Sequence, residues 1–516
     1  MSGPSPEWRA LLGDLERRRA DAMRAGGEAR IEREHSLGRL TARERIAQLV
    51  DDGSFLEFGT FVTTPTEDGV LPPTFICGLA EIDGRPVAIG AEDFTVERGG
   101  VGVHLKRLKG SWGGFVEEIA YGYRIPLVLL MQSAAGSVGL QELKGYPELV
   151  STMPTFPIYE LMEEVPVVTA VLGPTAGSSA ARASISHFSV MTDENGCLFA
   201  GGPPLVKQAL GIDVDKLELG GADVHVRTSG LIDNAAADDA SALEQVRRFL
   251  SYLPGRVDEL PVVASGWDAH DQERLLEIVS PNGRQAYNPE ALIECLVDVG
   301  SFFEIGRGFG RALKTGLARI EGHPVGVLAT DNRHLAGSMD AAAAQKQEKF
   351  VRVCDRFHIP LAYLVDIPGF MIGPDAERSG VLKFGGRALE AIQRARVPVY
   401  TIQVRRSFGL GGQATGSPNV KSVRLAWPSG IWGDMPVQGG IAAAFGSQIA
   451  ASADPAAERR AIEERFKTQT SIWSTVERFG VEEMIDPRAT RGYLARLLRL
   501  AYRVPPDLTG RARRGP

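Results

Sequence analysis

The sequence predicts an α/β protein made of two similar domains in tandem, and three observations carry this prediction. The chain has 516 residues, which is about three times a typical domain length, so more than one packed unit is expected. Short segments of the first half recur in the same order in the second half. Both halves alternate short aliphatic strands, glycine-rich turns and helix-length segments.

Four pairs of segments form the internal repeat. They are residues 54–59 with 301–306, 82–87 with 320–325, 125–131 with 359–365, and 165–168 with 397–400. The offset between partners falls steadily from 247 to 232 residues, as loop deletions between two copies of one fold would produce. We therefore expect one domain over residues 1–265, with a leading helical segment, and a second over 266–516. Prolines and charges within residues 259–288 indicate the linker between them.

The expected strands end at turns of small residues. In the first half, strands are expected over 126–131 and 167–172; each is followed by a glycine-containing turn, and a helix begins within 179–186. In the second half, strands over 361–365 and 399–404 lead into the turns 366–370 (DIPGF) and 408–416 (FGLGGQATG). This order of strand, turn, helix and strand is that of a βαβ unit, so a mainly parallel sheet is expected in each half.

Composition excludes several classes of protein. The 64 acidic residues exceed the 57 lysines and arginines, so no basic footprint for nucleic acid is present. The four cysteines form no C-x-x-C pair and the histidines form no H-E-x-x-H, so we expect neither a disulfide framework nor a metal site. The longest apolar runs are far shorter than the ~20 residues that cross a bilayer, and no apolar signal region occurs near the N-terminus. We expect a cytoplasmic protein.

The glycine-rich turns are candidates for binding an anion. A strand that stops at small residues and opens a helix leaves peptide N–H groups without partners, and such donors stabilise an oxygen that gains negative charge during a reaction. Small residues are required there because a bulky side chain would keep a substrate carbonyl out of hydrogen-bond range. The alternative is that glycine and alanine only let helix and strand pack closely. Recurrence of the turns at duplicated positions favours the functional interpretation.

Several motifs resemble the carboxyltransferase β subunits of biotin-dependent acyl-CoA carboxylases of the propionyl-CoA and methylcrotonyl-CoA type. They are residues 38–46 (GRLTARERI), 51–57 (DDGSFLE), 92–95 (EDFT), 218–222 (ELGGA), 350–355 (FVRVCD) and 365–370 (VDIPGF), within a resemblance that runs from Glu32 to Arg503. The resemblance implies two tandem domains of the ClpP/crotonase superfamily. It also implies a homo-oligomer, usually a hexamer, with active sites where the N-terminal domain of one subunit faces the C-terminal domain of another.

The same resemblance implies two sets of backbone donors. The first lies in the turn 133–136, where the amides of Ala134 and Ala135 would face the enolate oxygen of the acyl-CoA thioester. The second lies in the turn 408–411, where the amides of Leu410 and Gly411 would face the ureido oxygen of biotin. Substrate-binding roles are expected at four further positions, Gly173, Ala176, Gly177 and Gln413.

This sequence departs from the family pattern in ways that concern the substrate. Ala134 and Ala135 replace the usual pair of glycines, and Leu410 fills a position that is often glycine or alanine. Gln413 stands where the propionyl-type enzymes carry an acidic residue associated with acyl choice. The Phe-Gly-x-Gly spacing is closer to the methylcrotonyl and geranyl type. The sequence therefore does not identify the acyl chain of the substrate.

The resemblance also implies what the chain needs from elsewhere. No Met-Lys-Met biotinyl motif and no ATP-binding glycine loop occur, so biotin would arrive on a biotin carboxylase or biotin carboxyl carrier subunit. Coenzyme A would enter as the thioester substrate, and no metal is expected. Biotin itself is the expected base, and the enolate would add to the CO₂ released in a closed site.

Other polar residues have two interpretations each. Asp366 is either a general base or an aspartate that begins a turn, and the second interpretation is favoured. His104 and His187 are expected to be structural. A cation near the diphosphate of coenzyme A is expected, but the sequence does not choose among Lys106, Arg107 and Lys109.

Two other functions remain open at this point. One is a biotin-independent decarboxylase or hydrolase of crotonase type, which would use the same donors on a malonyl-type thioester. The other is an assembly subunit of a carboxylase complex without catalytic activity. Loss of CO₂ without biotin would favour the first, and failure to bind CoA thioesters would favour the second.

Overall fold

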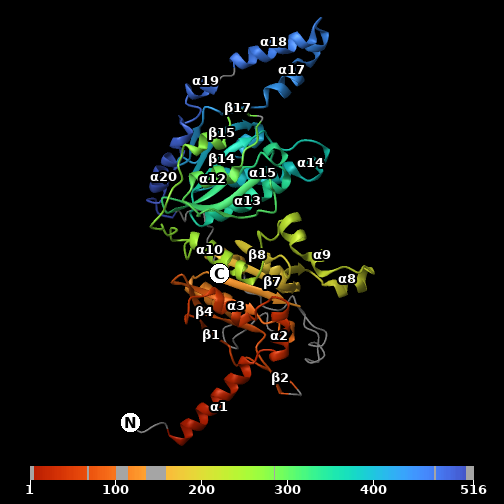
Figure 1. Ribbon diagram of the computed structural model, residues 1–516, viewed down its shortest axis with the longest axis vertical. Coiled ribbons are helices and arrows are strands. Elements are labelled where there is room, and N and C mark those ends of the chain that lie inside the picture. The colour runs from red at the N-terminus through yellow and green to blue at the C-terminus, as the bar shows by residue number, and fades with distance from the viewer. Residues whose placement is uncertain are drawn as a thin grey trace. The chain divides into compact units, whose positions relative to one another are not determined.

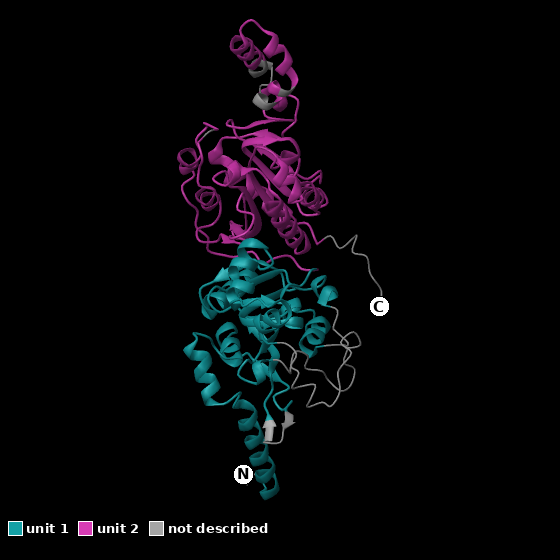
Figure 2. Ribbon diagram, turned by 90° about the vertical axis from the view of Figure 1, so that its right-hand side faces the viewer, with its two compact units in different colours: residues 1–257 teal, residues 258–516 magenta. Residues whose placement is uncertain are grey.

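A computed structural model of the chain describes residues 5–66, 69–99, 114–134, 158–283, 285–469 and 472–506. The chain divides into two compact units, Met1–Val257 and Asp258–Pro516 (Figure 2). The whole of the expected linker, residues 259–288, belongs to the second unit, and its residues Leu275, Val279 and Tyr287 are buried in that unit's core.

The first unit is built on an eight-stranded sheet. Its strands are β1 (Leu56–Phe58), β4 (Phe75–Ile82), β5 (Arg85–Glu92), β6 (Leu127–Ser133), β7 (Val167–Ala176), β8 (Phe188–Thr192), β9 (Cys197–Phe199) and β10 (Asn234–Ala236). The order is β1-β4-β5-β6-β7-β8-β10, with β9 paired to β7. The β1–β4 and β4–β5 pairs are antiparallel and every other pair is parallel, which confirms the mainly parallel sheet.

Helices of the first unit cover and precede this sheet (Figure 1). They are α1 (Pro6–Met23), α2 (Glu28–Ser36), α3 (Ala42–Leu49), α4 (Phe115–Tyr123), α6 (Ile158–Met162), α7 (Gly177–Ala183), α8 (Pro203–Leu210), α9 (Lys216–Gly220) and α10 (Asp239–Tyr252), with short turns η1 (Glu97–Gly99) and η3 (Asp223–Thr228) and a hairpin of β2 (Thr64–Thr66) and β3 (Gly69–Leu71). Local signals set their starts: α3 begins with a capping box of Thr41 and Glu44, and α10 with one of Asp238 and Ser241.

The second unit repeats this architecture. Its strands are β11 (Phe303–Glu304), β12 (Leu313–Ile320), β13 (His323–Thr330), β14 (Leu361–Ile367), β15 (Val399–Phe408), β16 (Val423–Ala426), β17 (Ile431–Gly433) and β18 (Glu483–Met484). The order is β11-β12-β13-β14-β15-β16-β18, with β17 paired to β15. Its helices and short turns are α11 (Arg274–Ile278), α12 (Pro289–Leu296), η4 (Leu335–Gly337), α13 (Ala341–Arg356), α14 (Pro374–Arg378), α15 (Val381–Gln393), α16 (Gly409–Gln413), α17 (Val437–Ala451), α18 (Pro455–Gln469), α19 (Ile472–Val476), η5 (Pro487–Ala489) and α20 (Thr490–Ala501).

The duplication is visible in the pairing of strands. β6 pairs with β7 and β14 with β15 in matching registers, and both pairs shift register near their carboxyl ends, between Met131 and Ser133 and between Val365 and Ile367. The repeated segments 125–131 and 359–365 thus lie on the equivalent strands β6 and β14, and the segments 165–168 and 397–400 lead into the equivalent strands β7 and β15. The structure therefore confirms two tandem copies of one α/β fold.

The strands run further than the sequence predicts. β7 continues through Ala176 and β15 through Phe408, four residues beyond the expected ends in each case. The extra residues pair with short additional strands, Pro174 with Cys197 and Arg406 with Ile431. Residues that look like turn residues in the sequence are therefore strand residues here, because a distant segment supplies their hydrogen-bond partners.

The leading segment contains the helices α1 and α2. Glu34 of α2 is buried, where it forms an ion pair with Arg39 and accepts a hydrogen bond from Gln132. In the described part of the chain, no helix is both long and apolar enough to cross a bilayer.

Candidate active site

The turn that follows β15 holds the second predicted set of donors. Gly409 has a φ of +54°, a left-handed conformation that glycine adopts without strain. Gly411 packs against Gly369, and a Cβ on it would lie 2.8 Å from that residue's backbone. The amides of Leu410 and Gly411 belong to the first turn of α16, and no hydrogen-bond acceptor outside the helix is placed against them in the described residues. This turn is therefore built from glycine for geometric reasons and leaves backbone donors free.

A cavity of about 260 Å³ lies beside this turn. It is lined by Gln403, Ser407, Gly409, Gly412, Gln413, Arg424, Trp432, Gly433, Asp434, Thr475, Gly480 and Val481. Gln413 is the predicted substrate-binding residue among them. Leu410 and Gly411 belong to the same turn but do not line the cavity, and the Leu410 side chain is 48% exposed.

Gln403 is a polar residue of this cavity that the sequence analysis missed. Its side chain is 5% exposed, and its Oε1 atom has no hydrogen-bond partner within the described parts of the chain. An unpaired buried acceptor costs roughly 1–3 kcal/mol, so it is expected where a ligand supplies the missing donor. A glutamine within the mainly β-branched and aromatic segment 399–404 was the available signal. Trp432 is fixed on the same cavity because its Nε1 donates to Thr475 Oγ1 at 3.1 Å.

The first predicted turn differs from the second. The amide of Ala134 donates to the carbonyl of Arg98 at 2.9 Å, so this amide is not free to hold an oxyanion in the structure. Ala135 lies outside the described residues. Ser133, at the end of β6, corresponds in the repeat to Ile367, at the end of β14. The second predicted turn instead follows Phe408, at the end of β15, so the two predicted turns follow strands that are not equivalent.

The equivalent of the second turn in the first unit follows β7. Ala176 and Gly177 occupy the positions of Phe408 and Gly409, and Gly177 has a φ of +60°. Gly173, the remaining predicted substrate-binding residue, lies within β7, where a Cβ would meet the side chain of Gln132 at 2.6 Å. Three of the predicted substrate-binding residues thus lie along one strand and its turn.

A buried carboxyl group ties this turn to the neighbouring strand. Glu92, at the end of β5, accepts a hydrogen bond from Ser179 Oγ at 2.5 Å and one from the amide of Gln132 at 2.8 Å. Burial raises the pKa of Glu92 to about 7, although the hydrogen bond from Ser179 and the charge of Arg182 oppose this rise. Arg182 forms an ion pair with Glu117. In the sequence, Glu92 is marked only by its place in the motif 92–95.

Asp366 has the environment of a structural carboxylate. It is fully buried, and its oxygens form ion pairs with Arg405 and Arg406 at 2.7 Å each. Burial raises its pKa, but the hydrogen bond and charge of Arg406, with Arg405 and Asn332, hold the pKa below its usual value. A general base would need a free carboxylate, so the structural interpretation is supported.

Of the other polar residues considered in the sequence, the structure describes only His187. His187 is buried, and its Nδ1 accepts a hydrogen bond from the amide of Val167 at 3.0 Å, which fits the structural role expected for it. His104, Lys106, Arg107 and Lys109 lie outside the described residues. Within the described ranges, no three His, Cys, Asp or Glu side chains gather as a possible metal site.

Comparison with known proteins identifies the family. The sequence model of the carboxyl transferase domain matches residues 33–514. The chain belongs to the carboxyl transferase family. It is 33% identical over 502 residues to the propionyl-CoA carboxylase carboxyltransferase subunit of Haloferax mediterranei, with 95% of each chain covered. It is 31% identical to the methylmalonyl-CoA decarboxylase subunit alpha of Propionigenium modestum, with 93% of each covered.

A solved structure agrees with this membership. Transcarboxylase 12S, described as a hexamer with methylmalonyl-coenzyme A and methylmalonic acid bound, matches with a TM-score of 0.84 and 30% identity over 98% of this chain and 96% of that one. The predicted pair of crotonase-like domains is confirmed. The predicted activity, that of a carboxyltransferase of the acyl-CoA carboxylase type, is confirmed as well.

Proposed function

We propose that this chain is the subunit of a biotin-dependent acyl-CoA carboxylase that moves CO₂ from carboxybiotin, carried by a partner subunit, to an acyl-CoA. The observation that carries the proposal is the strand and glycine turn present once in each unit, at Gly177 and Gly409, in a chain of the carboxyl transferase family. Each turn offers backbone donors at the carboxyl end of a parallel strand, which is where ligands bind in open α/β sheets.

The second unit is assigned to biotin in this proposal. The amides of Leu410 and Gly411 hold the ureido oxygen, and Gln413 contributes to the wall of the cavity. Gln403 Oε1 accepts a hydrogen bond from an N–H group of the ligand, which removes the cost of its unpaired state. Biotin supplies the CO₂ and the base that takes the acidic proton of the acyl group, and the chain's own residues orient it.

The first unit is assigned to the thioester. Ser178 and Ser179 are the repeat partners of Leu410 and Gly411, so their amides are the donors that we assign to the enolate oxygen. Ala135 remains a candidate outside the described residues, whereas the amide of Ala134 is already bound to Arg98. Gly173 and Ala176 keep this strand end narrow enough for the thioester to approach the backbone.

The partner, assembly and compartment follow from the same reasoning. Biotin arrives on a biotin carboxylase or biotin carboxyl carrier subunit, because this sequence contains no biotinyl motif. The chain assembles with copies of itself, and the hexamer of transcarboxylase 12S is the arrangement to test first. The free cysteines Cys77, Cys197, Cys295 and Cys354 fit a reducing cytoplasm. Propionyl-CoA is the first substrate to test, since the relative from Haloferax mediterranei is named for it.

The test combines the purified chain with a carboxylated biotin carrier and propionyl-CoA. Carboxylated product should form only when the carrier is present. Gln403→Leu should raise the KM for the carrier about tenfold by removing one acceptor, without lowering the melting temperature, because the lost atom was unpaired. Gln393→Leu, on the exposed end of α15, is the matched control and should leave KM unchanged. Unchanged kinetics in Gln403→Leu would remove Gln403 from the proposed site.

A second function is kept because one relative is named a decarboxylase. The methylmalonyl-CoA decarboxylase subunit alpha is 31% identical to this chain, and the same donors would stabilise the enolate that remains when CO₂ leaves a malonyl-type thioester. Incubation with methylmalonyl-CoA in the absence of biotin separates the two. Release of CO₂ under those conditions would favour the biotin-independent decarboxylase. A chain that binds no CoA thioester but copurifies with a biotin carboxylase would instead be an assembly subunit.

A further inference from the structure

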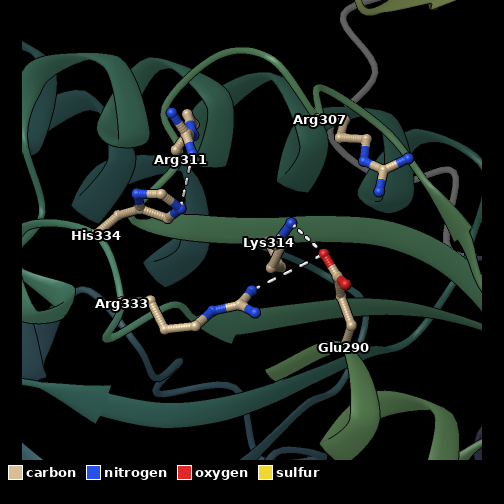
Figure 3. Close-up of a pocket in the computed structure, with 6 residues that line it drawn as sticks. All are labelled: Glu290, Arg307, Arg311, Lys314, Arg333 and His334. Carbon is tan, nitrogen blue, oxygen red and sulfur yellow. Dashed lines mark hydrogen bonds and ion pairs between the residues drawn. The ribbon is translucent and has the colours of Figure 1, made fainter. Parts of the chain in front are cut away.

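The second unit contains a strongly basic pocket whose lining residues have no role in the reaction as proposed so far. It has a volume of about 400 Å³ and is lined by Glu290, Arg307, Arg311, Lys314, Arg333 and His334 (Figure 3). Four of the six lining residues are permanent cations, and only one is an acid. None of them belongs to the cavity beside the turn after β15.

The pocket lies at the functional edge of the second sheet. Arg311 lies two residues before Leu313, the first residue of β12, which pairs with Thr330 at the carboxyl end of β13. Arg333 and His334 follow β13 at the same edge. The next residues continue toward the catalytic turn, because the carbonyl of Ala336 accepts a hydrogen bond from Arg406 of β15 at 3.0 Å. Carboxyl ends of parallel strands are the usual ligand-binding edge of such sheets.

The loop that carries Arg307 and Arg311 packs on α13 and is hydrogen-bonded to it. Lys346 of that helix donates from Nζ to the carbonyls of Phe309 and Leu313 at 2.9 and 2.7 Å. Gly310 has a φ of +54° and lies so close to the helix that a Cβ would meet its backbone at 2.8 Å. The loop is therefore fixed by packing and hydrogen bonds, and the two arginines extend from a rigid base.

The acids around the pocket orient some of its cations without neutralising all of them. Lys314 donates to Glu290 and Glu304 at 2.7 and 2.9 Å. Arg333 forms a bidentate pair with the buried Asp331 through Nε and Nη2, at 2.9 and 2.8 Å, and Nη2 also forms a longer ion pair with Glu290 at 3.9 Å. The N–H groups of its Nη1 have no partner among the described residues. Figure 3 shows the carboxylate of Glu290 in contact with both Lys314 and Arg333.

Arg311 is the cation left without an acid. Its one hydrogen bond in the described structure runs from Nη2 to His334 Nε2 at 3.1 Å (Figure 3), and no described carboxylate forms an ion pair with it. Arg307 is largely exposed, and its contact with Glu304 is long, at 3.5 Å. The positive charge of the pocket is therefore concentrated where Arg311 and Arg307 face solvent.

We propose that this pocket binds a phosphoryl group, with Arg311, Arg307 and the free N–H groups of Arg333 as its donors. Guanidinium groups present paired N–H donors that match the oxygens of a phosphate, and several of them around one ligand favour a group with more than one negative charge. A carboxylate would occupy little of a 400 Å³ pocket and would satisfy one arginine, whereas a phosphate or diphosphate reaches several. The phosphoryl group belongs either to the coenzyme A thioester or to a separate nucleotide.

The test uses inorganic pyrophosphate and the full-length chain, measured by titration calorimetry at low ionic strength. Saturable binding is expected, and Arg311→Gln should weaken it about tenfold. Arg311 is exposed, so this substitution should leave the melting temperature unchanged. Arg394→Gln removes another exposed arginine, which is paired with Glu390 of α15, and this variant should bind pyrophosphate as the wild type does. No saturable binding, or equal binding by the wild type and Arg311→Gln, would overturn the proposal.

Competition distinguishes the two sources of the phosphoryl group. If it belongs to coenzyme A, propionyl-CoA displaces pyrophosphate, and Arg311→Gln raises the KM for propionyl-CoA while kcat stays constant. If propionyl-CoA does not displace pyrophosphate and ATP does, the ligand is a separate nucleotide. Only the assignment to coenzyme A rests on the proposed carboxyl transfer. Binding of pyrophosphate remains measurable in a chain that carboxylates no substrate, so failure of one proposal is distinguishable from failure of the other.

Discussion

Glu92 shows how one buried side chain makes the first unit sensitive to pH. Its carboxyl group joins β5 to the end of β6 through the amide of Gln132 and to α7 through Ser179. Burial raises its pKa to about 7, against a usual value of 4.5. Between these two values the unfolded chain releases the proton while the folded chain keeps it. The free energy of unfolding therefore decreases as pH rises from about 4.5 to 7, by on the order of 3 kcal/mol.

Replacement of Glu92 by glutamine should remove this dependence. A glutamine retains an acceptor for the Gln132 amide and offers an N–H₂ group to Ser179 Oγ, so both contacts are preserved. The melting temperature of Glu92→Gln minus that of the wild type should become more positive between pH 5 and pH 8. Glu160→Gln, an exposed position on α6, should show no such trend. A difference that does not change with pH would mean that Glu92 is already ionised in the folded chain.

Gln403 and Gln413 show what sequence predicts at the level of single residues. Gln413 was found because the resemblance assigns a role to its position, and the structure places it on the cavity. Gln403 carries no motif, and Thr401 and Arg405 are also polar residues buried in the same strand. Whether its Oε1 finds a partner depends on side chains from distant segments such as Trp432 and Thr475, and no local pattern encodes that arrangement.

The elements to which we assign the reaction are the two strand-to-helix turns. Gly409 begins α16 with a φ of +54°, and a Cβ there would lie 3.1 Å from the carbonyl of Asp434. Alanine in a left-handed conformation costs on the order of 1 kcal/mol, and the close carbonyl adds to this cost. Gly409→Ala should therefore displace the amides of Leu410 and Gly411 and lower kcat for carboxyl transfer at least about tenfold.

Gly386→Ala is the matched control for this substitution. Gly386 lies inside α15 with open space around its Cα, so alanine should be neutral or slightly stabilising there. Steady-state kinetics and melting temperature should be measured for both variants. A normal kcat in Gly409→Ala would show that the geometry of this turn is not needed for catalysis.

At the scale of elements, sequence locates strands better than it locates their ends. The predicted strands over 126–131, 167–172, 361–365 and 399–404 all exist, because aliphatic runs between glycine turns are strong local signals. Each extends further, and β7 and β15 do so by pairing with β9 and β17. The hydrogen bond from Ala134 to Arg98 has the same origin: the carbonyl comes from η1, and only the folded chain brings the two together.

For the whole molecule, the internal repeat was the most informative part of the sequence. Steady offsets require two copies of one fold, and the strand registers of the two sheets agree with that requirement. The repeat also favours a different first turn from the predicted one. Aligning the copies by their strands places Gly177 opposite Gly409, whereas the family resemblance implied Ala134 and Ala135 as the first set of donors.

Assembly of several chains should bury the carboxyl edge of the second sheet. Large apolar side chains are exposed after three successive parallel strands, namely Leu335 after β13, Ile372 after β14 and Leu410 after β15. Exposed apolar groups gathered at one edge are typical of an interface, and another copy of this chain is the occupant that the proposed hexamer supplies. Ile372 is 85% exposed, so a charge there costs little in the free chain and much in a closed interface.

Native mass measurement of two glutamate variants tests this expectation. Ile372→Glu should shift the population from hexamers of the 55.6 kDa chain toward smaller species, with an unchanged circular dichroism spectrum. Val420→Glu is matched in chemistry and exposure, at 99%, but it precedes β16 and so belongs to the opposite edge of the sheet. It should leave the mass distribution as it is in the wild type. If the two variants changed the mass distribution equally, or neither changed it, the carboxyl edge would not be the surface that joins the chains, because the effect of the added charge would not depend on the edge that carries it.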